Sequence, residues 1–246
     1  MSDNPVPGPE TTKASLPARV RAPDTPGDDS ADFGFRRVKR GEKAGMVRAV
    51  FDSVAPRYDL MNDLMSLGVH RVWKRIFITT LDPRPRDRLL DLAGGTGDIS
   101  FGWLAKGGGP VLLSDINASM LAVAQNRAVE RVSIAFGLRN CTDKDAVLRE
   151  ARRVLKPGGR FCCLEFSRVQ VAALQPLYDA WSFRVLPRLG QVVAHDSDSY
   201  QYLAESIRTF PDQAKLAAMM RAAEFARVSV RNLSGGIAAI HQGWRL

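Results

Sequence analysis

The chain has 246 residues, of which 45% are hydrophobic and 25% are charged, and this length allows one α/β domain with a substantial core. No apolar run approaches the ~18 residues that a membrane span needs, which excludes an integral membrane protein. The net charge of +9 favours an anionic neighbour, but the arginines are scattered along helical stretches without interleaved aromatic residues, so nucleic acid is not an expected partner.

Cysteine usage and the first 32 residues bear on the compartment. The three cysteines form no CxxC pair and no even framework, so we expect neither zinc nor disulfides. Residues 1–32 are rich in Pro, Ser, Asp and Gly without an apolar period, which predicts a disordered N-terminal extension. Its acidic residues argue against a transit peptide, and the lack of an apolar centre argues against a signal peptide. We therefore expect a cytoplasmic protein without a metal.

A helical region is expected at the start of the folded part, over residues 33–81. The stretch KAGMVRAVFDSVAPRYDLMN places Met46, Val50 and Val54 on one helical face, and Pro56 interrupts the pattern. Two or three helices should therefore lie ahead of the sheet.

Strands and helices alternate over residues 88–168, where DRLLDLAGGTGDIS, GPVLLSDINASML, VSIAFGL, TDKDAVLREARRVL and RFCCLEFS follow one another. A long helical insert covers residues 169–211. Residues 212–246 then contain the helix DQAKLAAMMRAAEF and two strands joined at Gly235 and Gly236. This order predicts an α/β fold with a mostly parallel sheet, an antiparallel C-terminal hairpin and helices on both faces.

The stretch LLDLAGGTGD places glycines where a strand turns sharply into a helix, so that backbone can approach a ligand at the helix N-terminus. No Gly-Lys-Ser/Thr follows, which excludes a Walker loop, and Ser100 at the third glycine position fits a dinucleotide fingerprint poorly. Asp91 instead suits a cationic ligand, such as the sulfonium and amino end of S-adenosylmethionine. Asp91, Gly95 and Gly97 are therefore candidate cofactor-binding residues.

Asp115 comes 20 residues after Gly95, at the end of the next strand. At this spacing a carboxylate can accept hydrogen bonds from two ribose hydroxyls. The alternative is that Asp115 caps the following helix. Because Asn117 and Ser119 can cap that helix as well, we favour the ribose role.

Six stretches carry a resemblance to one family: FDSVAPRYDLMNDLMSLGVHRVWKR, LLDLAGGTGD, SDINASML, IAFGLRNCTDKDAVLREARRVLKPGGRF, LEFSRV and DSYQYLAESIRTFPDQ. Over nearly all of residues 33–246 the chain resembles the ubiquinone/menaquinone biosynthesis C-methyltransferase family. The resemblance implies a Rossmann-like class I methyltransferase fold and S-adenosyl-L-methionine as cofactor. It also implies C-methylation of a polyprenylated quinol, namely 2-methoxy-6-polyprenyl-1,4-benzoquinol, demethylmenaquinol or both. Within this methyltransferase domain, residues 33–81 would form a helical lid, 88–168 the cofactor-binding core, and 169–211 the substrate cover.

The resemblance also implies roles for single residues. Thr96 and Asp115 match cofactor-binding positions, and Ala135 falls where the family often has a cofactor-contacting serine. Arg139 and Asn140 fall at the substrate end of the pocket.

Methyl transfer to a ring carbon requires aligned atoms and a quinol that becomes a phenolate. Arg139, directly after a strand, is expected to stabilise that phenolate or to hold a water, with Asn140 orienting it. The alternative for Arg139 is a bridge to the next helix. Tyr58, in the lid, would pack on the quinol ring, although an ordinary core aromatic fits the sequence equally well. His195 is a weaker candidate for the base, because lone histidines more often make structural hydrogen bonds.

The chain departs from the family between SDINASML and IAFGLRN. There the family normally has a helix, a third strand, an adenine-lining loop and a further helix, whereas this chain goes straight from QNRAVE to RVSIAF. Roughly two dozen residues are missing, enough for a strand and a helix. We expect the sheet to lack its third, edge strand, and a helix around Met120–Val129 to carry the connection.

Loss of the adenine loop should cost on the order of 2–4 kcal/mol of cofactor affinity. Two functions therefore stay open. The chain is an active quinol C-methyltransferase, or it is a catalytically impaired member that serves as a non-catalytic subunit of a quinone-biosynthesis assembly.

The insert segment PLYDAWSFRVLPRLG mixes large apolar residues with Arg184 and Arg188. This composition fits a surface helix near acidic lipid, and it fits a cover over the active site equally well. The expected partners are a polyprenylated quinol substrate, the inner face of the membrane through peripheral contact, and other quinone-biosynthesis enzymes.

Overall fold

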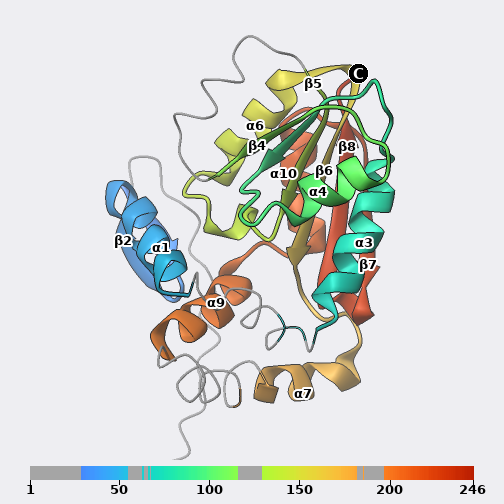
Figure 1. Ribbon diagram of the computed structural model, residues 1–246. Helices are drawn as coiled ribbons and strands as arrows, with labels where there is room; N and C mark the ends of the chain where they lie inside the picture. Colours follow the sequence, from blue (N-terminus) through green and yellow to red (C-terminus); the bar gives the residue numbers. More distant parts are fainter. Residues whose placement is uncertain are drawn as a thin grey trace, which may run out of the picture.

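The computed structural model describes residues 29–54, 63, 66, 68–115, 129–181, 185 and 197–246. A six-stranded sheet of order β4-β3-β5-β6-β8-β7 forms its centre (Figure 1). The strands are β3 (Leu89–Leu92), β4 (Val111–Ser114), β5 (Val129–Ala135), β6 (Leu155–Phe166), β7 (Ala226–Leu233) and β8 (Ala238–Trp244). The first four are parallel, and β8 is antiparallel to both β6 and β7. The predicted α/β class with an antiparallel C-terminal hairpin is confirmed.

Strand β4 forms the edge of the sheet, with no described strand beyond it. This agrees with the prediction that the third strand is missing. The interior of the sheet is complete, because Leu89 of β3 lies opposite Val111 of β4 on one side and Arg131 of β5 on the other. A parallel strand with both neighbours retains its full set of backbone hydrogen bonds, so the shortened edge leaves the centre intact.

Strand β5 begins earlier than the sequence analysis expected. The sequence placed the break between Glu130 and Arg131, but β5 already begins at Val129, which is buried and pairs with Leu155. The carboxylate of Glu130 accepts a hydrogen bond from the backbone N–H of Arg88 at 2.8 Å, which fixes this end of the strand. The predicted helix Met120–Val129 therefore cannot include Val129, and its remaining residues lie outside the described part of the chain.

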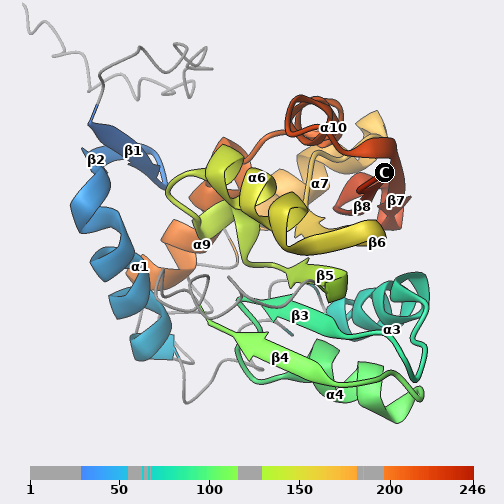
Figure 2. The same ribbon diagram turned by 90° about the horizontal axis from the view of Figure 1, so that it is seen from above.

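Helices cover both faces of the sheet, as the view from above in Figure 2 shows. One face carries α3 (His70–Leu81) and α4 (Asp98–Ala105), and the other carries α6 (Lys144–Val154) and α10 (Gln213–Ala222). Successive residues of each strand point to opposite faces, so Leu89 joins the first core and Leu90 the second. This alternation explains why the buried strands are mostly apolar, with few buried polar residues such as Asp91 and Ser133.

The remaining described elements lie beyond the carboxyl ends of the parallel strands (Figures 1 and 2). They are the hairpin β1 (Ser30–Phe33) and β2 (Arg36–Lys39), then α1 (Arg40–Val54), α7 (Gln175–Ala180) and α9 (Ser197–Thr209).

The hairpin corrects one boundary, because Ser30, Ala31 and Asp32 belong to β1 and not to a disordered extension. Gly34, with a φ of 61°, makes the turn, and the ring of Phe33 stacks on Tyr202 of α9 at 4.2 Å between centroids.

Candidate active site

The glycine turn joins β3 to α4 and leaves its backbone open to a ligand. Gly95 and Gly97 have positive φ angles of 49° and 83°, which favour glycine. A Cβ atom at Gly95 would meet nothing within 4 Å, and both Gly95 and Thr96 are exposed. Gly97 lies at the N-terminal end of α4. The turn therefore fits a ligand that approaches backbone N–H groups closely.

Asp91 lies beneath this turn and is only 1% exposed. Its two carboxylate oxygens accept hydrogen bonds from the hydroxyls of Ser100 and Ser133, each at 2.7 Å. Burial is the main cause that raises the pKa of this carboxyl above its ordinary value, while the serine hydrogen bonds oppose the shift. The observed contacts of Asp91 are thus internal and tie the turn to β5, and a direct contact with a ligand stays a prediction.

Asp115 lies beside the glycine turn, because β3 and β4 are neighbouring parallel strands. The backbone N–H of Gly94 donates to the carbonyl of Ser114 at 3.1 Å, and Asp115 follows as an exposed residue. The helix that Asp115 would cap in the alternative reading lies outside the described residues.

Ala135 ends β5 at the same edge and is half-buried. The predicted cofactor-binding residues therefore meet at one edge of the sheet.

Arg139 lies in the short 3-10 helix η3 (Leu138–Asn140), directly after β5. Its guanidinium forms a buried ion pair with Glu165 of β6, with 2.7 Å between Nη1 and Oε1. The same Nη1 donates to the carbonyl of Phe136 at 2.6 Å. The predicted alternative, a bridge to the helix that follows, is not what the structure shows: the partner is Glu165 on the neighbouring strand.

Asn140 is also buried, and its side-chain oxygen accepts a hydrogen bond from the hydroxyl of Tyr202 at 3.2 Å. Burial raises the pKa of Tyr202 to about 12, so this hydroxyl stays a donor at neutral pH. Among the described residues, neither Nε of Arg139 nor Nδ2 of Asn140 has a hydrogen-bond partner. Two buried N–H donors on adjacent residues thus remain without an acceptor among the described residues, at the carboxyl edge of the sheet. Such unsatisfied buried polar groups are uncommon in native proteins.

Helix α1, within the predicted lid, contacts the loop that follows η3. Lys43 of α1 is buried and donates to the carbonyl of Cys141 at 3.2 Å, and burial is the main cause that lowers its pKa to about 8. Arg40 forms an ion pair with Asp143 at 3.1 Å. The other predicted residue of the lid, Tyr58, lies outside the described residues, as does His195 of the insert.

Ser133, Glu165 and Tyr202 were missed by the sequence analysis. Ser133 and Glu165 had one usable signal, because each is a polar residue inside an apolar strand and a buried polar group requires a partner. Tyr202 had no such signal, since its contact with Asn140 spans 62 positions of sequence.

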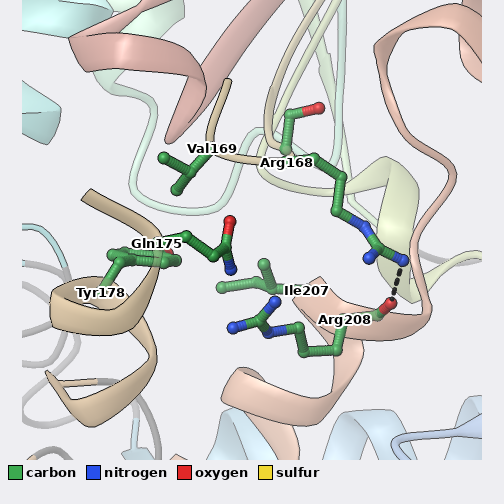
Figure 3. Close-up of a pocket in the computed structure, with 7 residues that line it drawn as sticks. Arg168, Val169, Gln175, Tyr178, Ile207 and Arg208 are labelled. Atoms are coloured by element: carbon green, nitrogen blue, oxygen red, sulfur yellow. Dashed lines mark hydrogen bonds between the residues drawn. The ribbon is translucent and has the colours of Figure 1, made fainter. Parts of the chain in front are cut away.

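A separate small pocket lies between the end of β6, α7 and α9 (Figure 3). Arg168 contributes to its wall and donates to the carbonyl of Arg208 at 3.1 Å. Burial is the main cause that lowers the pKa of Arg208, and the charge of Arg168 adds to the effect. The pocket lies where the predicted cofactor-binding core, at Ser167 and Arg168, meets the region predicted to be the substrate cover.

Comparison with known proteins identifies the family. The model of the ubiE/COQ5 methyltransferase family matches residues 37–133 and 128–245. The chain belongs to this family. The match comes in two stretches that meet near the start of β5, where the sequence predicts the missing segment. For a ubiE/COQ5 methyltransferase with this fold, S-adenosylmethionine is the cofactor.

Similar relatives extend over nearly the whole chain. The ubiquinone/menaquinone biosynthesis C-methyltransferase UbiE of Acidiphilium cryptum is 66% identical over 243 residues, covering 89% of this chain and 98% of that protein. The UbiE of Bradyrhizobium diazoefficiens is 51% identical over 254 residues, covering 91% and 100%. Because 89% of 246 residues is about 219, about 24 of the 243 positions in the first comparison have no residue in this chain. This agrees with the two dozen residues predicted to be missing.

Two solved structures show the same fold. A SAM-dependent methyltransferase from Thermotoga maritima has a TM-score of 0.51 at 16% identity and covers 81% of this chain and 100% of that one. A putative methyltransferase in complex with the Haloferax volcanii Trm112 activator has a TM-score of 0.54 at 15% identity and covers 79% and 97%. In the described part of the chain, no helix is long and apolar enough to cross a membrane.

Proposed function

We propose that this chain methylates a ring carbon of a polyprenylated quinol, 2-methoxy-6-polyprenyl-1,4-benzoquinol, demethylmenaquinol or both, in quinone biosynthesis. The observation that carries the proposal is the pair of buried donors without partners, Nε of Arg139 and Nδ2 of Asn140. They lie at the edge where class I methyltransferases bind their ligands, at the carboxyl ends of the strands. The family membership supports the same reaction class.

For the cofactor, we propose that the turn Gly95-Thr96-Gly97 receives the amino-acid end of S-adenosylmethionine and that Asp115 accepts the ribose hydroxyls. Ala135 would lie against the cofactor from β5, and Asp91 would support the turn from beneath. When bound, the cofactor supplies a methyl group on a sulfonium centre. Holding it at this edge would bring it next to η3 and to the two donors.

The chemistry that this chain's residues would perform concerns the quinol oxygen. The quinol oxygen becomes negatively charged when its hydroxyl loses a proton, before the ring carbon attacks the methyl group, and a fixed N–H donor stabilises that phenolate strongly in a site without water. Arg139 would donate from Nε and Asn140 from Nδ2. Tyr58 is proposed to pack on the quinol ring.

A second candidate function is a non-catalytic subunit of a quinone-biosynthesis assembly. The two-part family match and the positions that this chain lacks relative to UbiE support it. The two functions differ in a measurable way, because only the enzyme turns over quinol.

We also propose peripheral contact with the inner face of the membrane and with other quinone-biosynthesis enzymes. A polyprenyl tail keeps the substrate in the bilayer, and the net charge of +9 favours acidic lipid. Co-sedimentation with acidic and with neutral vesicles tests this contact. The proposal predicts that the chain binds to the acidic vesicles alone.

The test of the proposed reaction is the variant Arg139→Ala. It should lower the methylation rate and leave the affinity for S-adenosylmethionine unchanged, because Arg139 acts on the quinol. Arg153→Ala is the matched control, since Arg153 forms an exposed pair with Glu150 away from the site. Normal turnover combined with weakened cofactor binding would reverse the assignment of Arg139.

A further inference from the structure

The buried carboxylate of Glu165 has no role in the function proposed above. Its side chain is 1% exposed and lies on β6, next to η3. It accepts three hydrogen bonds: from Nη1 of Arg139 at 2.7 Å, from the backbone N–H of Arg139 at 3.2 Å and from the backbone N–H of Phe166 at 3.0 Å. A buried charge is costly unless it is paired and hydrogen-bonded, so each of these contacts contributes to keeping Glu165 in place.

These contacts fix the orientation of the Arg139 side chain. Nη1 has two hydrogens, and the structure uses both, one toward Glu165 and one toward the carbonyl of Phe136. The guanidinium carbon also lies 5.4 Å from the ring centroid of Phe166. Because the guanidinium is planar, two fixed bonds at one end determine where the remaining N–H groups point. Nε is a buried guanidinium atom without a hydrogen-bond partner among the described residues.

The backbone at this point supports the same conclusion. Phe136 has a φ of 57°, a conformation that costs a bulky residue free energy and persists only where surrounding contacts hold it. Its carbonyl is the second acceptor of Arg139 Nη1. The ion pair between Arg139 and Glu165 and the backbone turn at Phe136 therefore stabilise each other. Glu165 contacts both the side chain and the main chain of Arg139.

We propose that Glu165 is the positioning residue for methyl transfer, which holds Arg139 so that its Nε–H is presented to the quinol oxygen. This inference rests on the proposed function, because the orientation of Arg139 matters only if Arg139 acts on the quinol. Glu165 itself touches neither quinol nor cofactor. Its effect should therefore appear in kcat and pass through Arg139.

The test is the variant Glu165→Gln, measured alone and combined with Arg139→Ala. Glutamine keeps the size of the side chain but lacks the charge and has one acceptor oxygen in place of two, so the guanidinium loses its fixed orientation. We expect kcat to fall about 10- to 100-fold, because small displacements of a reacting group have effects of this size. The KM for S-adenosylmethionine should stay within about twofold, since none of the residues assigned to that ligand is a hydrogen-bond partner of Glu165. In the Arg139→Ala background, Glu165→Gln should cause no further loss.

Glu150→Gln is the matched control, because it makes the same chemical change in the partly exposed Arg153 pair and should leave kcat unchanged. If Arg139→Ala is slow while Glu165→Gln turns over normally, the positioning role is overturned and the proposed function stands. If Arg139→Ala itself turns over normally, the role of Arg139 fails, and with it the inference. Losses that multiply in the double variant would show that Glu165 acts independently, which also overturns the inference.

A second variant covers the case in which Glu165→Gln does not fold, as judged by circular dichroism. Glu165→Asp keeps the charge but is shorter by one methylene group, so it should lower kcat by a smaller factor, and Arg139→Ala should again abolish the difference. Calorimetric binding of a short-tailed reduced quinol to the same variants repeats the comparison without turnover. Equal quinol affinity in Glu165→Asp and the unmodified chain, together with equal kcat, would contradict the proposal.

Discussion

The carboxyl edge of the sheet has an exposed half and a buried half. At β3 and β4, the polar residues assigned to the cofactor, Thr96 and Asp115, are exposed. At β5 and β6, Arg139, Asn140 and Glu165 are all 6% exposed or less and contact one another or neighbouring elements. We expect this difference to reflect the missing segment, which the resemblance to the family places at the β4 edge.

This comparison shows that the two halves depend on different parts of the chain. The buried half is held by β6, η3 and α9, all of which are present. In the described part of the chain, no element covers the exposed half. We therefore expect the chain to fold normally and to form the buried half, which is assigned to the quinol, but to bind S-adenosylmethionine weakly. The predictions below test this contrast, beginning with the largest expected effect.

His241 is buried in the interior of the sheet, outside both halves, and it tests how far a buried group makes stability depend on pH. Its side chain lies on β8, is 1% exposed, and has Nε2 3.1 Å from the carbonyl of Gln213. Burial lowers its pKa from 6.5 to about 4, against the smaller opposing effect of that hydrogen bond. Because the folded pKa lies below the unfolded one, its stabilising contribution is present above pH ~6.5 and is lost as the pH falls toward 4, by about 3 kcal/mol in total.

The measurement is urea unfolding of the unmodified chain and of His241→Gln between pH 7 and pH 4. The variant should lose the part of the pH dependence that His241 contributes. Asp115→Ala, in the exposed half, should keep the profile of the unmodified chain. Identical profiles for the unmodified chain and His241→Gln would show that this histidine does not titrate as stated.

Asp115→Ala tests the exposed half. Loss of a charged acceptor for the ribose hydroxyls should weaken S-adenosylmethionine binding by about 1.5–3 kcal/mol, or about 10- to 150-fold. Because Asp115 is exposed, the free energy of unfolding should hardly change. Calorimetry and urea unfolding measure the two quantities, with Glu150→Ala as control. Unchanged affinity would remove the ribose role from Asp115.

Ala93 tests the junction between the halves. Ala93 directly follows β3 and has a φ of 52°. Its Cβ lies so close to Gly137 that a Cβ atom built on Gly137 would be only 2.5 Å away from it. Replacing Ala93 by Gly should raise the free energy of unfolding by about 1 kcal/mol, because glycine adopts positive φ without steric cost. Ala151→Gly, in the interior of α6, should lower it. A decrease for Ala93→Gly would show that the side chain of Ala93 contributes more than its backbone conformation costs.

Much of the fold was predictable, because its signals are local. Glycines and an acidic residue mark the turn after β3, and runs of apolar residues mark the strands on either side of it. The strand order without the third strand followed from comparing segment lengths with the family. The β1–β2 hairpin was not predictable, since its short strands are half polar and depend on contacts with α9 far along the chain, such as the bond from Phe35 N–H to Glu205 at 2.9 Å.

The site was predictable only in part, for the same reason. Arg139 and Asn140 could be located from FGLRN, but their partners could not. Glu165 is 26 positions from Arg139, and the two meet only because β5 and β6 are neighbours in the sheet. The end of the helix predicted over Met120–Val129 was wrong at Val129, because that residue is compatible with a helix end in the sequence, whereas pairing with β6 makes it a strand residue.

The most direct test of the account is a pair of calorimetric titrations with S-adenosylmethionine, at one temperature and salt concentration. One sample is the unmodified chain, and the other carries the residues of the Acidiphilium cryptum relative that have no counterpart in this chain, inserted directly before Val129 so that β5 stays whole. The account predicts that both chains fold and that the repaired chain binds about 30- to 1000-fold more tightly, equivalent to the 2–4 kcal/mol assigned to the adenine wall. Equal micromolar affinity in both chains would contradict it, because adenine would then be held without the missing segment.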